Sequence, residues 1–310
     1  MTIASPIRRA IPAGASISQW AAPDGWPIRR FDWPAEDEAR GAILFQGGRG
    51  DVFEKYLETF GHWHDAGWTI ASFDWRGQGG SGRLSANPRV GHAADFAPWI
   101  ADLAAFWRSW EAPGPRVIMG HSMGGYLVLR ALVERAVDPA AAVLVAPMLG
   151  LKAPVGPWLG EKAARLMCRL GDPARAAWQG HERPGARLDR QKLLTHDATR
   201  YADEGFWYVE KPEIQLGPPS WAWLAQAFAG TRALEADPRL AAMTTPVMLL
   251  VAEADGLVDP RAALRVAGKL PAAQVVRFGP ESAHEILREA DPVRDRALAA
   301  IDAFLETHAR

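Results

Sequence analysis

Cysteine is almost absent from this chain of 310 residues, in which Cys168 is the only one. A single cysteine cannot form a disulfide within the chain, and it gives no basis for a cysteine-rich metal site. Cys168 falls in a predicted helix, where we interpret it as a small apolar packing residue rather than a redox group. We therefore expect a cytoplasmic protein.

An excess of charge of either sign is also lacking. The 35 basic and 36 acidic residues give a formal net charge of −1, whereas a nucleic-acid partner requires a basic face. With 48% hydrophobic and 23% charged residues, the composition is that of an ordinary globular protein. We therefore expect a small-molecule partner and no nucleic acid.

Long apolar runs are missing as well. No stretch approaches the roughly 18 uninterrupted apolar residues of a membrane-spanning helix. Residues 1–15 contain Arg8 and Arg9 without an adequate apolar segment behind them, so we expect no secretory signal. Peripheral contact with the inner face of a membrane stays open, and the sequence does not indicate the oligomeric state.

The most informative stretch is 117–128, which combines a short apolar run, the pattern Gly120-x-Ser122-x-Gly124 and the start of a helical segment. A strand, a glycine-flanked serine and a helix in this order predict a nucleophile elbow. In such a turn the serine lies at the start of the helix, where free N–H groups favour a developing oxyanion. Ser122 is therefore the candidate nucleophile.

Strand-like and helix-like segments alternate along most of the chain. The predicted strands are 16–20, 27–33, 42–45, 69–73, 117–119, 140–146, 246–251 and 274–278. The predicted helices outside the region discussed next are 52–66, 95–110, 126–135, 260–270 and 291–308. The first two strands read as an edge hairpin, and the rest predict an α/β fold with a mostly parallel sheet flanked by helices.

The alternation breaks after the sixth predicted strand. Residues 148–230 contain many prolines and glycines, short helical segments and several tryptophans. We interpret them as a helical cap over the carboxyl ends of the strands, where open α/β sheets bind ligands, with residues 1–147 and 231–310 as the core. The alternative is a second structural lobe with surface tryptophans. The cap interpretation assigns substrate binding to four tryptophans: Trp158, Trp178, Trp207 and Trp221.

A nucleophilic serine needs a histidine base, and that base needs a carboxylate to orient it. His284 follows the last predicted strand, and Asp255 follows the strand before it. Both therefore lie past the carboxyl ends of strands, as Ser122 does, and the order Ser122, Asp255, His284 is that of the α/β-hydrolase fold. Two rival acids are weaker, since Asp259 precedes Pro260 and suits a helix N-cap, and Glu253 lies nearer the strand.

Two backbone N–H groups should form the oxyanion hole. One belongs to Met123, the residue after the nucleophile. The other should come from the glycine-rich loop after the strand 42–45, where Gly48 is the preferred donor and Gly47 the alternative.

Together these motifs resemble the serine hydrolases of the α/β-hydrolase superfamily, in the group that includes lysophospholipase L2 and monoacylglycerol lipase. The matching segments are Gln46-Gly47-Gly48, the run from Asp74 to Ser81, Asp95-Phe96 with Asp102-Leu103, the elbow, Asp255-Gly256-Leu257-Val258 and Ala283-His284. The resemblance implies the α/β-hydrolase fold and an ester that acylates Ser122, with water releasing the acid, and it implies no metal or organic cofactor. The sequence departs from the group at Gln46, where a histidine is usual.

The expected function is that of a lysophospholipase or monoacylglycerol lipase, because acyl chains require an apolar pocket. A small ester or an amide at a peptide N-terminus is an alternative substrate within the same fold, since fold does not determine chemistry. The alternative of another class is a ligand-binding protein without turnover, although all three candidate triad residues are present.

Overall fold

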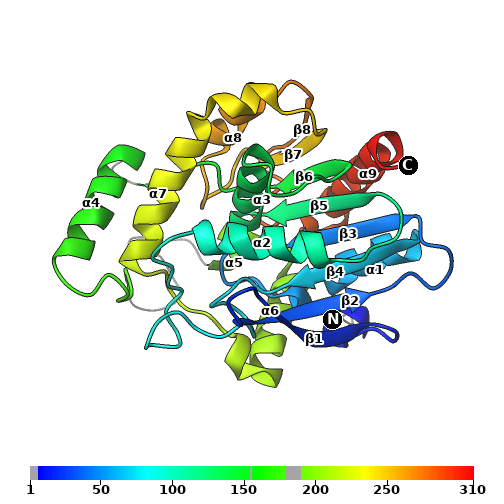
Figure 1. Cartoon of the computed structure of the whole chain (residues 1–310), viewed down its shortest axis with the longest axis horizontal. Coiled ribbons are helices and arrows are strands. Elements are labelled where there is room, and N and C mark those ends of the chain that lie inside the picture. The colour runs from blue at the N-terminus through cyan, green and yellow to red at the C-terminus, as the bar shows by residue number, and fades with distance from the viewer. Residues whose placement is uncertain (1–5, 154–155, 179–189) are drawn as a thin grey trace.

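A computed structural model of the chain describes residues 6–153, 156–178 and 190–310. In this part of the chain eight strands form one sheet, in the order β1-β2-β4-β3-β5-β6-β7-β8 (Figure 1). The strands are β1 Ser16–Ala21, β2 Pro27–Trp33, β3 Gly41–Gln46, β4 Trp68–Phe73, β5 Arg116–His121, β6 Ala141–Val145, β7 Val247–Ala252 and β8 Ala273–Phe278. β2 pairs antiparallel with β1 and β4, and the other neighbours pair in parallel. The predicted α/β-hydrolase fold is confirmed.

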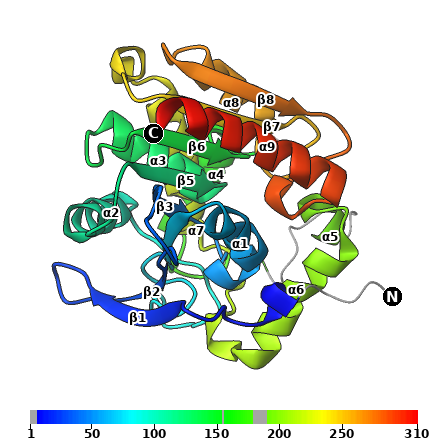
Figure 2. The ribbon, with the colours of Figure 1, turned by 90° about the vertical axis from the view of Figure 1, so that its right-hand side faces the viewer.

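Helices cover both faces of the sheet (Figures 1 and 2). The residues of α2, α3 and α8 pack on one face, and those of α1 and α9 pack on the other. These helices are α1 Leu57–Asp65, α2 Ala97–Ser109, α3 Met123–Val133, α8 Pro260–Ala267 and α9 Asp291–His308. The segment predicted as one helix over 52–66 begins instead with a 3₁₀ turn, Phe53–Tyr56, and the helix after the elbow begins at Met123 rather than at residue 126.

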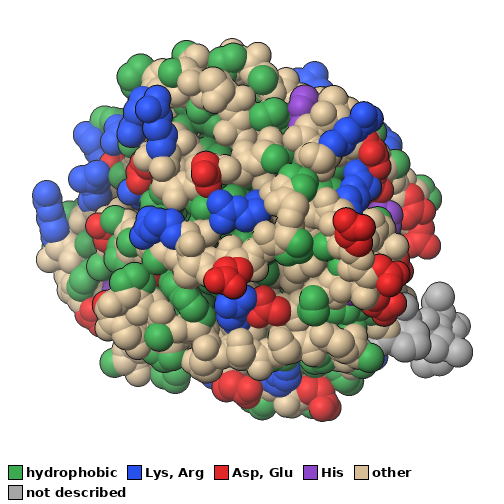
Figure 3. Space-filling model, turned by 45° about the vertical axis from the view of Figure 1, so that its right-hand side comes forward, with side chains coloured by type: hydrophobic (Ala, Val, Ile, Leu, Met, Phe, Trp, Pro, Cys, Tyr) green, Lys and Arg blue, Asp and Glu red, His purple; other side chains and the backbone are tan. Residues whose placement is uncertain are grey.

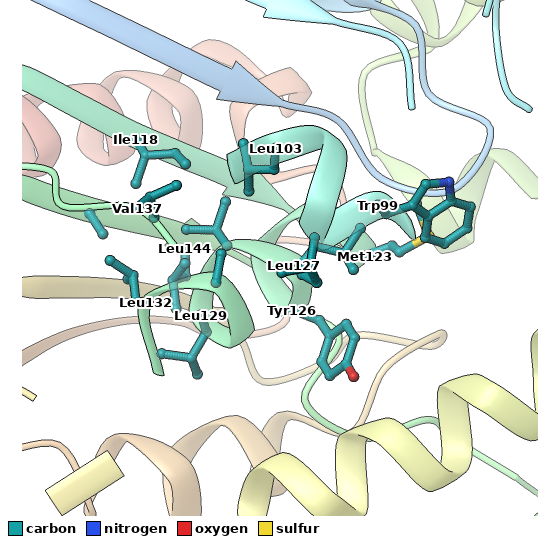
Figure 4. Packing of buried hydrophobic residues seen from close by; sticks show 14 of the residues in the cluster. Trp99, Leu103, Ile118, Met123, Tyr126, Leu127, Leu129, Leu132, Val137 and Leu144 are labelled. Carbon is teal, nitrogen blue, oxygen red and sulfur yellow. The ribbon is translucent and has the colours of Figure 1, made fainter. Parts of the chain in front are cut away.

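The core is divided between the two faces by the alternation of side chains along each strand. In β5, Ile118 contributes to the cluster beneath α2 and α3, whereas Val117 and Met119 contribute to the cluster beneath α1 and α9. Every residue of β3 and β7 is buried, because a parallel strand covered on both faces has no solvent side. Figure 4 shows the first of these clusters, in which Leu127 and Met123 of α3 lie close to Trp99 and Leu103 of α2.

The region predicted as a cap lies between β6 and β7. Its helices are α4 Pro157–Arg169, α5 Arg190–Leu194, α6 Ala198–Glu210 and α7 Trp221–Glu235. The predicted boundary at residue 230 falls within α7, which packs against α4 and continues to Glu235 (Figure 1). Gly230 of α7 lies directly against Tyr126 of α3, since a Cβ on Gly230 would come within 2.3 Å of the Tyr126 hydroxyl oxygen. The helix that begins directly after Ser122 therefore supports this region.

The loop after β4 is held by two arginine–carboxylate groups. Arg76 forms paired hydrogen bonds with Asp102 of α2, at 2.7 and 2.8 Å, and with Asp24 in the β1–β2 turn, at 2.7 and 2.9 Å. Asp74 accepts from Arg29 Nε at 2.7 Å and from the N–H of Gly80 at 2.7 Å. Paired arginine–carboxylate hydrogen bonds fix geometry in two directions, so these residues join the edge hairpin to the body of the sheet. Elsewhere on the surface, Figure 3 shows basic and acidic side chains scattered over one face, neither sign covering it.

Gln46 ends β3 directly below the glycine-rich loop. Its side chain is fully buried, and neither its amide oxygen nor its amide nitrogen has a hydrogen-bond partner in the described part of the chain. By contrast, the buried Gln78 accepts a hydrogen bond from the N–H of Gly50 at 2.6 Å. An unsatisfied buried amide costs free energy, whereas a satisfied one costs little.

We predict that Gln46→Met and Gln78→Met change stability in opposite directions. Gln46→Met removes an unsatisfied amide at nearly constant shape and should raise the free energy of unfolding by about 1 kcal/mol or more. Gln78→Met leaves the N–H of Gly50 without its acceptor and should lower that free energy by about 1 to 3 kcal/mol. Urea unfolding of the three proteins measures both changes, and a loss of stability in Gln46→Met would contradict the prediction.

Candidate active site

Ser122 lies at the junction between β5 and α3, in a backbone conformation that is unusual for a residue with a side chain. Its φ is 53° and its ψ is −118°, and its N–H donates to the carbonyl oxygen of Val145 at 3.0 Å. Gly124 allows the close turn, because a Cβ there would lie 2.3 Å from the carbonyl oxygen of Gln46. The predicted elbow therefore places the Ser122 hydroxyl at the first turn of α3.

The structure brings Ser122, His284 and Asp255 together from the loops after β5, β8 and β7. Ser122 Oγ lies 2.8 Å from His284 Nε2, and His284 Nδ1 lies 2.5 Å from Asp255 Oδ2. The other carboxylate oxygen of Asp255 accepts from the N–H groups of Leu257 at 2.7 Å and Val258 at 3.1 Å. This arrangement suits proton transfer from a serine to a histidine that a fixed carboxylate orients.

The rival acids have other partners. Asp259 caps α8 by accepting from the N–H of Arg261 at 3.0 Å. Glu253 lies near the surface and pairs with Arg277 at 3.3 Å. Neither carboxylate contacts His284 through a hydrogen bond, so Asp255 is the acid that the geometry places beside the histidine.

Burial and charge act in opposite directions on the histidine–aspartate pair. Burial alone would lower the pKa of His284, but the charge of Asp255 and its hydrogen bond outweigh burial and raise that pKa above the usual 6.5. Burial would raise the pKa of Asp255, yet His284 and the two backbone N–H groups lower it. The carboxylate therefore stays ionised and stabilises the imidazolium.

The two predicted oxyanion donors differ in their surroundings. The N–H of Met123 begins α3, where the first N–H groups of a helix have no partner within the helix. Gly48 lies against the nucleophile, since a Cβ on it would come within 2.9 Å of Ser122 Cβ. However, the N–H of Gly48 donates to Asp51 Oδ2 at 2.8 Å. In the described part of the chain, the N–H of Met123 is thus free to donate to an oxyanion. Gly48 lies at the predicted position of the second donor, but its N–H already forms a hydrogen bond with Asp51.

A buried charged network lies behind the triad and was not predicted. His121 Nδ1 lies 2.8 Å from both Asp51 Oδ2 and the Tyr56 hydroxyl, and His121 Nε2 lies 3.3 Å from the carbonyl oxygen of His284. Lys55 Nζ lies 2.6 Å from Asp51 and 2.7 Å from Glu285, the residue after the catalytic candidate His284. Burial would raise the pKa of Asp51, but Lys55 and His121 together outweigh burial and hold that pKa well below its usual value. From the sequence alone, charged residues at these positions are typical of a solvent-exposed first turn of a helix.

A cavity of about 430 Å³ opens beside Ser122 and His284. One part of its wall is apolar, and it comes mainly from the region between β6 and β7: Met148, Leu151, Trp178, Leu193, Leu216, Trp221, Trp223, Leu224, Phe228, Leu257 and Val258. The other part is charged, with Arg49, Asp51, Lys55, Lys152, Arg190, Glu204 and Glu285. The volume lies within the range of small-molecule sites, about 300 to 1,000 Å³.

Only two of the four tryptophans assigned to substrate binding line this cavity. Trp178 and Trp221 do, together with Trp223. Trp158 lies on the outer side of α4, where it is 57% exposed. Trp207 is 4% exposed and donates from its indole nitrogen to the carbonyl oxygen of Arg8 at 2.9 Å, so it packs α6 against the N-terminal segment. The assignment of Trp158 and Trp207 to the substrate site is therefore not supported by their positions.

Within residues 6–153, 156–178 and 190–310, no three His, Cys, Asp or Glu side chains gather in a way that could hold a metal ion. None of the helices in these ranges is long and apolar enough to cross a bilayer.

Comparisons with known proteins agree with this geometry. A family model described as "Serine aminopeptidase, S33" matches residues 37–291. Lysophospholipase L2 of Escherichia coli strain K12 is 33% identical over 298 residues, which cover 92% of this chain and 86% of the relative. Monoacylglycerol lipase of Mycolicibacterium smegmatis is 24% identical over 280 residues, covering 89% and 91%.

Among solved structures, a soluble variant of monoglyceride lipase from Saccharomyces cerevisiae in complex with a substrate analog superposes with a TM-score of 0.74. It is 16% identical and covers 96% of this chain and 98% of its own. The monoacylglycerol lipase of Paleococcus ferrophilus gives a TM-score of 0.70 at 21% identity, with 91% and 99% coverage. At these identities, the likeness establishes the fold.

The raised pKa of His284 predicts a displaced pH profile. Because His284 must be neutral to accept the serine proton, kcat/KM for a soluble short-chain ester should rise with pH through a midpoint above 6.5. Asp255→Asn should shift that midpoint downward and lower kcat by about 10³- to 10⁴-fold. Steady-state kinetics across pH measure both effects, and an unshifted midpoint in Asp255→Asn would contradict the role of Asp255.

Proposed function

The chain belongs to the α/β-hydrolase family described as Serine aminopeptidase, S33, and from this premise we propose that it hydrolyses the ester of a lysophospholipid or a monoacylglycerol through an acyl-enzyme. The observation that carries the proposal is the cavity, because one wall of it holds Ser122 and His284 while another is built of apolar side chains that suit an acyl chain. Relatives named lysophospholipase L2 and monoacylglycerol lipase support the same substrate class.

The proposed reaction begins with acylation of Ser122. Ser122 Oγ attacks the ester carbonyl carbon while its proton passes to His284 Nε2, 2.8 Å away. Asp255 stabilises the imidazolium that forms, and the N–H of Met123 donates to the oxyanion. Gly48 is the second donor in this proposal, and its N–H must first release Asp51 Oδ2, to which it donates at 2.8 Å.

His284 then protonates the leaving alcohol as the carbon–oxygen bond breaks, which leaves the acyl group on Ser122. A water molecule gives its proton to His284, attacks the acyl-enzyme and releases the fatty acid. The proton returns to Ser122, so the enzyme is regenerated without a cofactor.

The family description, Serine aminopeptidase, suggests an aminopeptidase-like activity as the alternative. Recognition of a peptide N-terminus requires a carboxylate that is free to bind an ammonium group. The cavity is lined by Asp51, Glu204 and Glu285, and each of these already pairs with a lysine or arginine side chain. The lining therefore suits a lipid ester better than a peptide amine.

We predict that activity on p-nitrophenyl esters rises with chain length from acetate to palmitate. Longer chains bury more apolar surface in the cavity, at about 0.8 kcal/mol per methylene group. Ser122→Ala should lower the activity by about 10⁴-fold or more. A spectrophotometric assay of both proteins checks this, followed by release of fatty acid from lysophospholipid and monoacylglycerol. Activity confined to the shortest esters, or faster turnover of aminoacyl amides, would contradict the proposed substrate class.

The proposal includes a location in the cytoplasm and peripheral contact with the inner face of a membrane. The membrane contact is supported by α4, which lies at the edge of the molecule (Figure 1). This helix exposes large apolar side chains: Trp158, Leu159, Leu166 and, just after the helix, Leu170. Lys162 stacks on Trp158, with its Nζ 3.8 Å from the ring centre, and the same helix carries Arg165 and Arg169. Apolar and basic side chains on one short helix suit the interface of an anionic bilayer.

If α4 binds membranes, Leu166→Ser combined with Leu170→Ser should reduce sedimentation with anionic vesicles by about 10-fold, because both side chains are more than half exposed. Hydrolysis of a soluble short-chain ester should not change. Val209→Ser, at an apolar residue of α6 that is even more exposed, is the control and should bind as the wild type does. Equal binding by all three proteins would contradict a membrane role for α4.

A further inference from the structure

Arg49 lines the cavity one residue after Gly48. Its Nη1 donates to the carbonyl oxygen of Gly217 at 2.8 Å, and its guanidinium carbon lies 5.6 Å from the centre of the Trp223 ring. In the described part of the chain, no carboxylate pairs with Arg49, and its Nε and Nη2 have no hydrogen-bond partner. Arg49 thus lines the cavity without a carboxylate partner in the described part of the chain.

The acidic residues of the cavity wall form no ion pair with Arg49 in the described part of the chain, and other groups occupy their oxygens. Asp51 accepts from Lys55 at 2.6 Å, from the Tyr56 hydroxyl at 2.8 Å and from the N–H of Gly48 at 2.8 Å. Asp51 therefore has its charge balanced without Arg49.

Glu204 and Glu285 are engaged in the same way. Glu204 forms paired hydrogen bonds with Arg190, at 2.7 and 2.9 Å, and accepts from the Tyr208 hydroxyl at 2.8 Å. Glu285 pairs with Lys55 at 2.7 Å and with Arg288. Among the described residues of the wall, four are basic and three are acidic: Arg49, Lys55, Lys152 and Arg190 against Asp51, Glu204 and Glu285.

A second positive charge acts on Arg49 from the same cavity. Burial lowers the pKa of Arg49 to about 10, and the positive charge of Arg190 contributes to the lowering. Two cationic side chains that repel one another at a cavity wall are stabilised by an anion that binds between them.

We propose that Arg49 binds the phosphate of a lysophospholipid headgroup while the ester lies at Ser122. The proposal rests on the proposed function and defines its substrate class, because a monoacylglycerol carries no phosphate. Two observations support it: Gly48, the residue before Arg49, lies against Ser122, and Arg49 lines the same cavity as Ser122. One glycerol unit separates the scissile ester of a lysophospholipid from its phosphate. The guanidinium group presents parallel N–H donors that match phosphate oxygens.

The alternative role for Arg49 is purely structural, as a clamp on the loop that contains Gly217. The two roles differ in their effect on substrates. Loss of a clamp should affect every substrate alike, whereas loss of a phosphate ligand should affect only substrates with a phosphate.

The test compares wild type, Arg49→Met and Arg49→Lys on 1-palmitoyl-lysophosphatidylglycerol, 1-palmitoylglycerol and p-nitrophenyl palmitate, which share one acyl chain. Arg49→Met should lower kcat/KM for the lysophospholipid by about 10- to 100-fold, the scale expected for a charge-assisted hydrogen bond, and change the other two by less than about 3-fold. Arg49→Lys should retain an intermediate activity because the charge remains. Arg108→Met, at an exposed arginine of α2, is the matched control and should leave all three unchanged.

Two kinetic outcomes would overturn the proposal: an equal loss on all three substrates in Arg49→Met, which indicates the clamp, and an unchanged lysophospholipid activity, which indicates no phosphate contact.

A binding measurement tests the same site without lipid turnover. In calorimetry with the wild type, sn-glycerol 3-phosphate should bind, and Arg49→Met should weaken it about 10-fold or more. Inorganic phosphate should bind more weakly than glycerol 3-phosphate, and equal affinity would contradict a headgroup site.

These measurements separate the further inference from the proposed function. If wild type and Ser122→Ala hydrolyse both lipids equally slowly, the proposed function is wrong, whatever Arg49 does. If the wild type hydrolyses both lipids and Arg49→Met keeps the same preference between them, only the phosphate site is wrong.

Discussion

The ion pairs of one buried lysine hold the active-site region together. Lys55 Nζ lies 2.6 Å from Asp51, 2.7 Å from Glu285 and 3.7 Å from Glu204. These acids come from the glycine-rich loop, the loop that contains His284, and α6. Burial would lower the pKa of Lys55, but the three carboxylates outweigh burial and raise it. Removing one member of such a group would leave the others buried and uncompensated, which is costly. The loop beside Ser122, the position of His284 and the docking of α6 therefore depend on the same charge.

Most of the fold, and the positions of the three triad residues, could be predicted from the sequence because one geometric rule governs them. In a parallel sheet, the carboxyl ends of the strands meet at one edge, so residues just past the strands containing Met119, Val251 and Phe278 had to lie near one another. The distances from Ser122 to His284 and from His284 to Asp255 agree with that reasoning. The N-cap role of Asp259 also followed from local sequence, because capping depends only on neighbouring N–H groups.

The cap and the charged network could not be predicted in the same way. A tryptophan fills a core as readily as it lines a cavity, and sequence alone did not separate Trp221, which faces the cavity, from Trp207, which packs against the N-terminal segment. Lys55 and Glu285 become informative only when long-range contacts place them 2.7 Å apart, 230 positions apart in the sequence. The free N–H expected at Gly48 was likewise altered by a nearby side chain, Asp51.

The division of the cavity wall into an apolar part and a charged part has an evolutionary consequence. Side chains such as Leu224 and Phe228 line the cavity without directed hydrogen bonds, so a volume-conserving exchange there costs little stability and can alter which acyl lengths fit. The charged part offers no such freedom, because each of its acids is shared between several partners. Within this lineage, acyl-length preference should therefore diverge between closely related species, whereas the charged end of the cavity should change slowly and by concerted replacement of several residues.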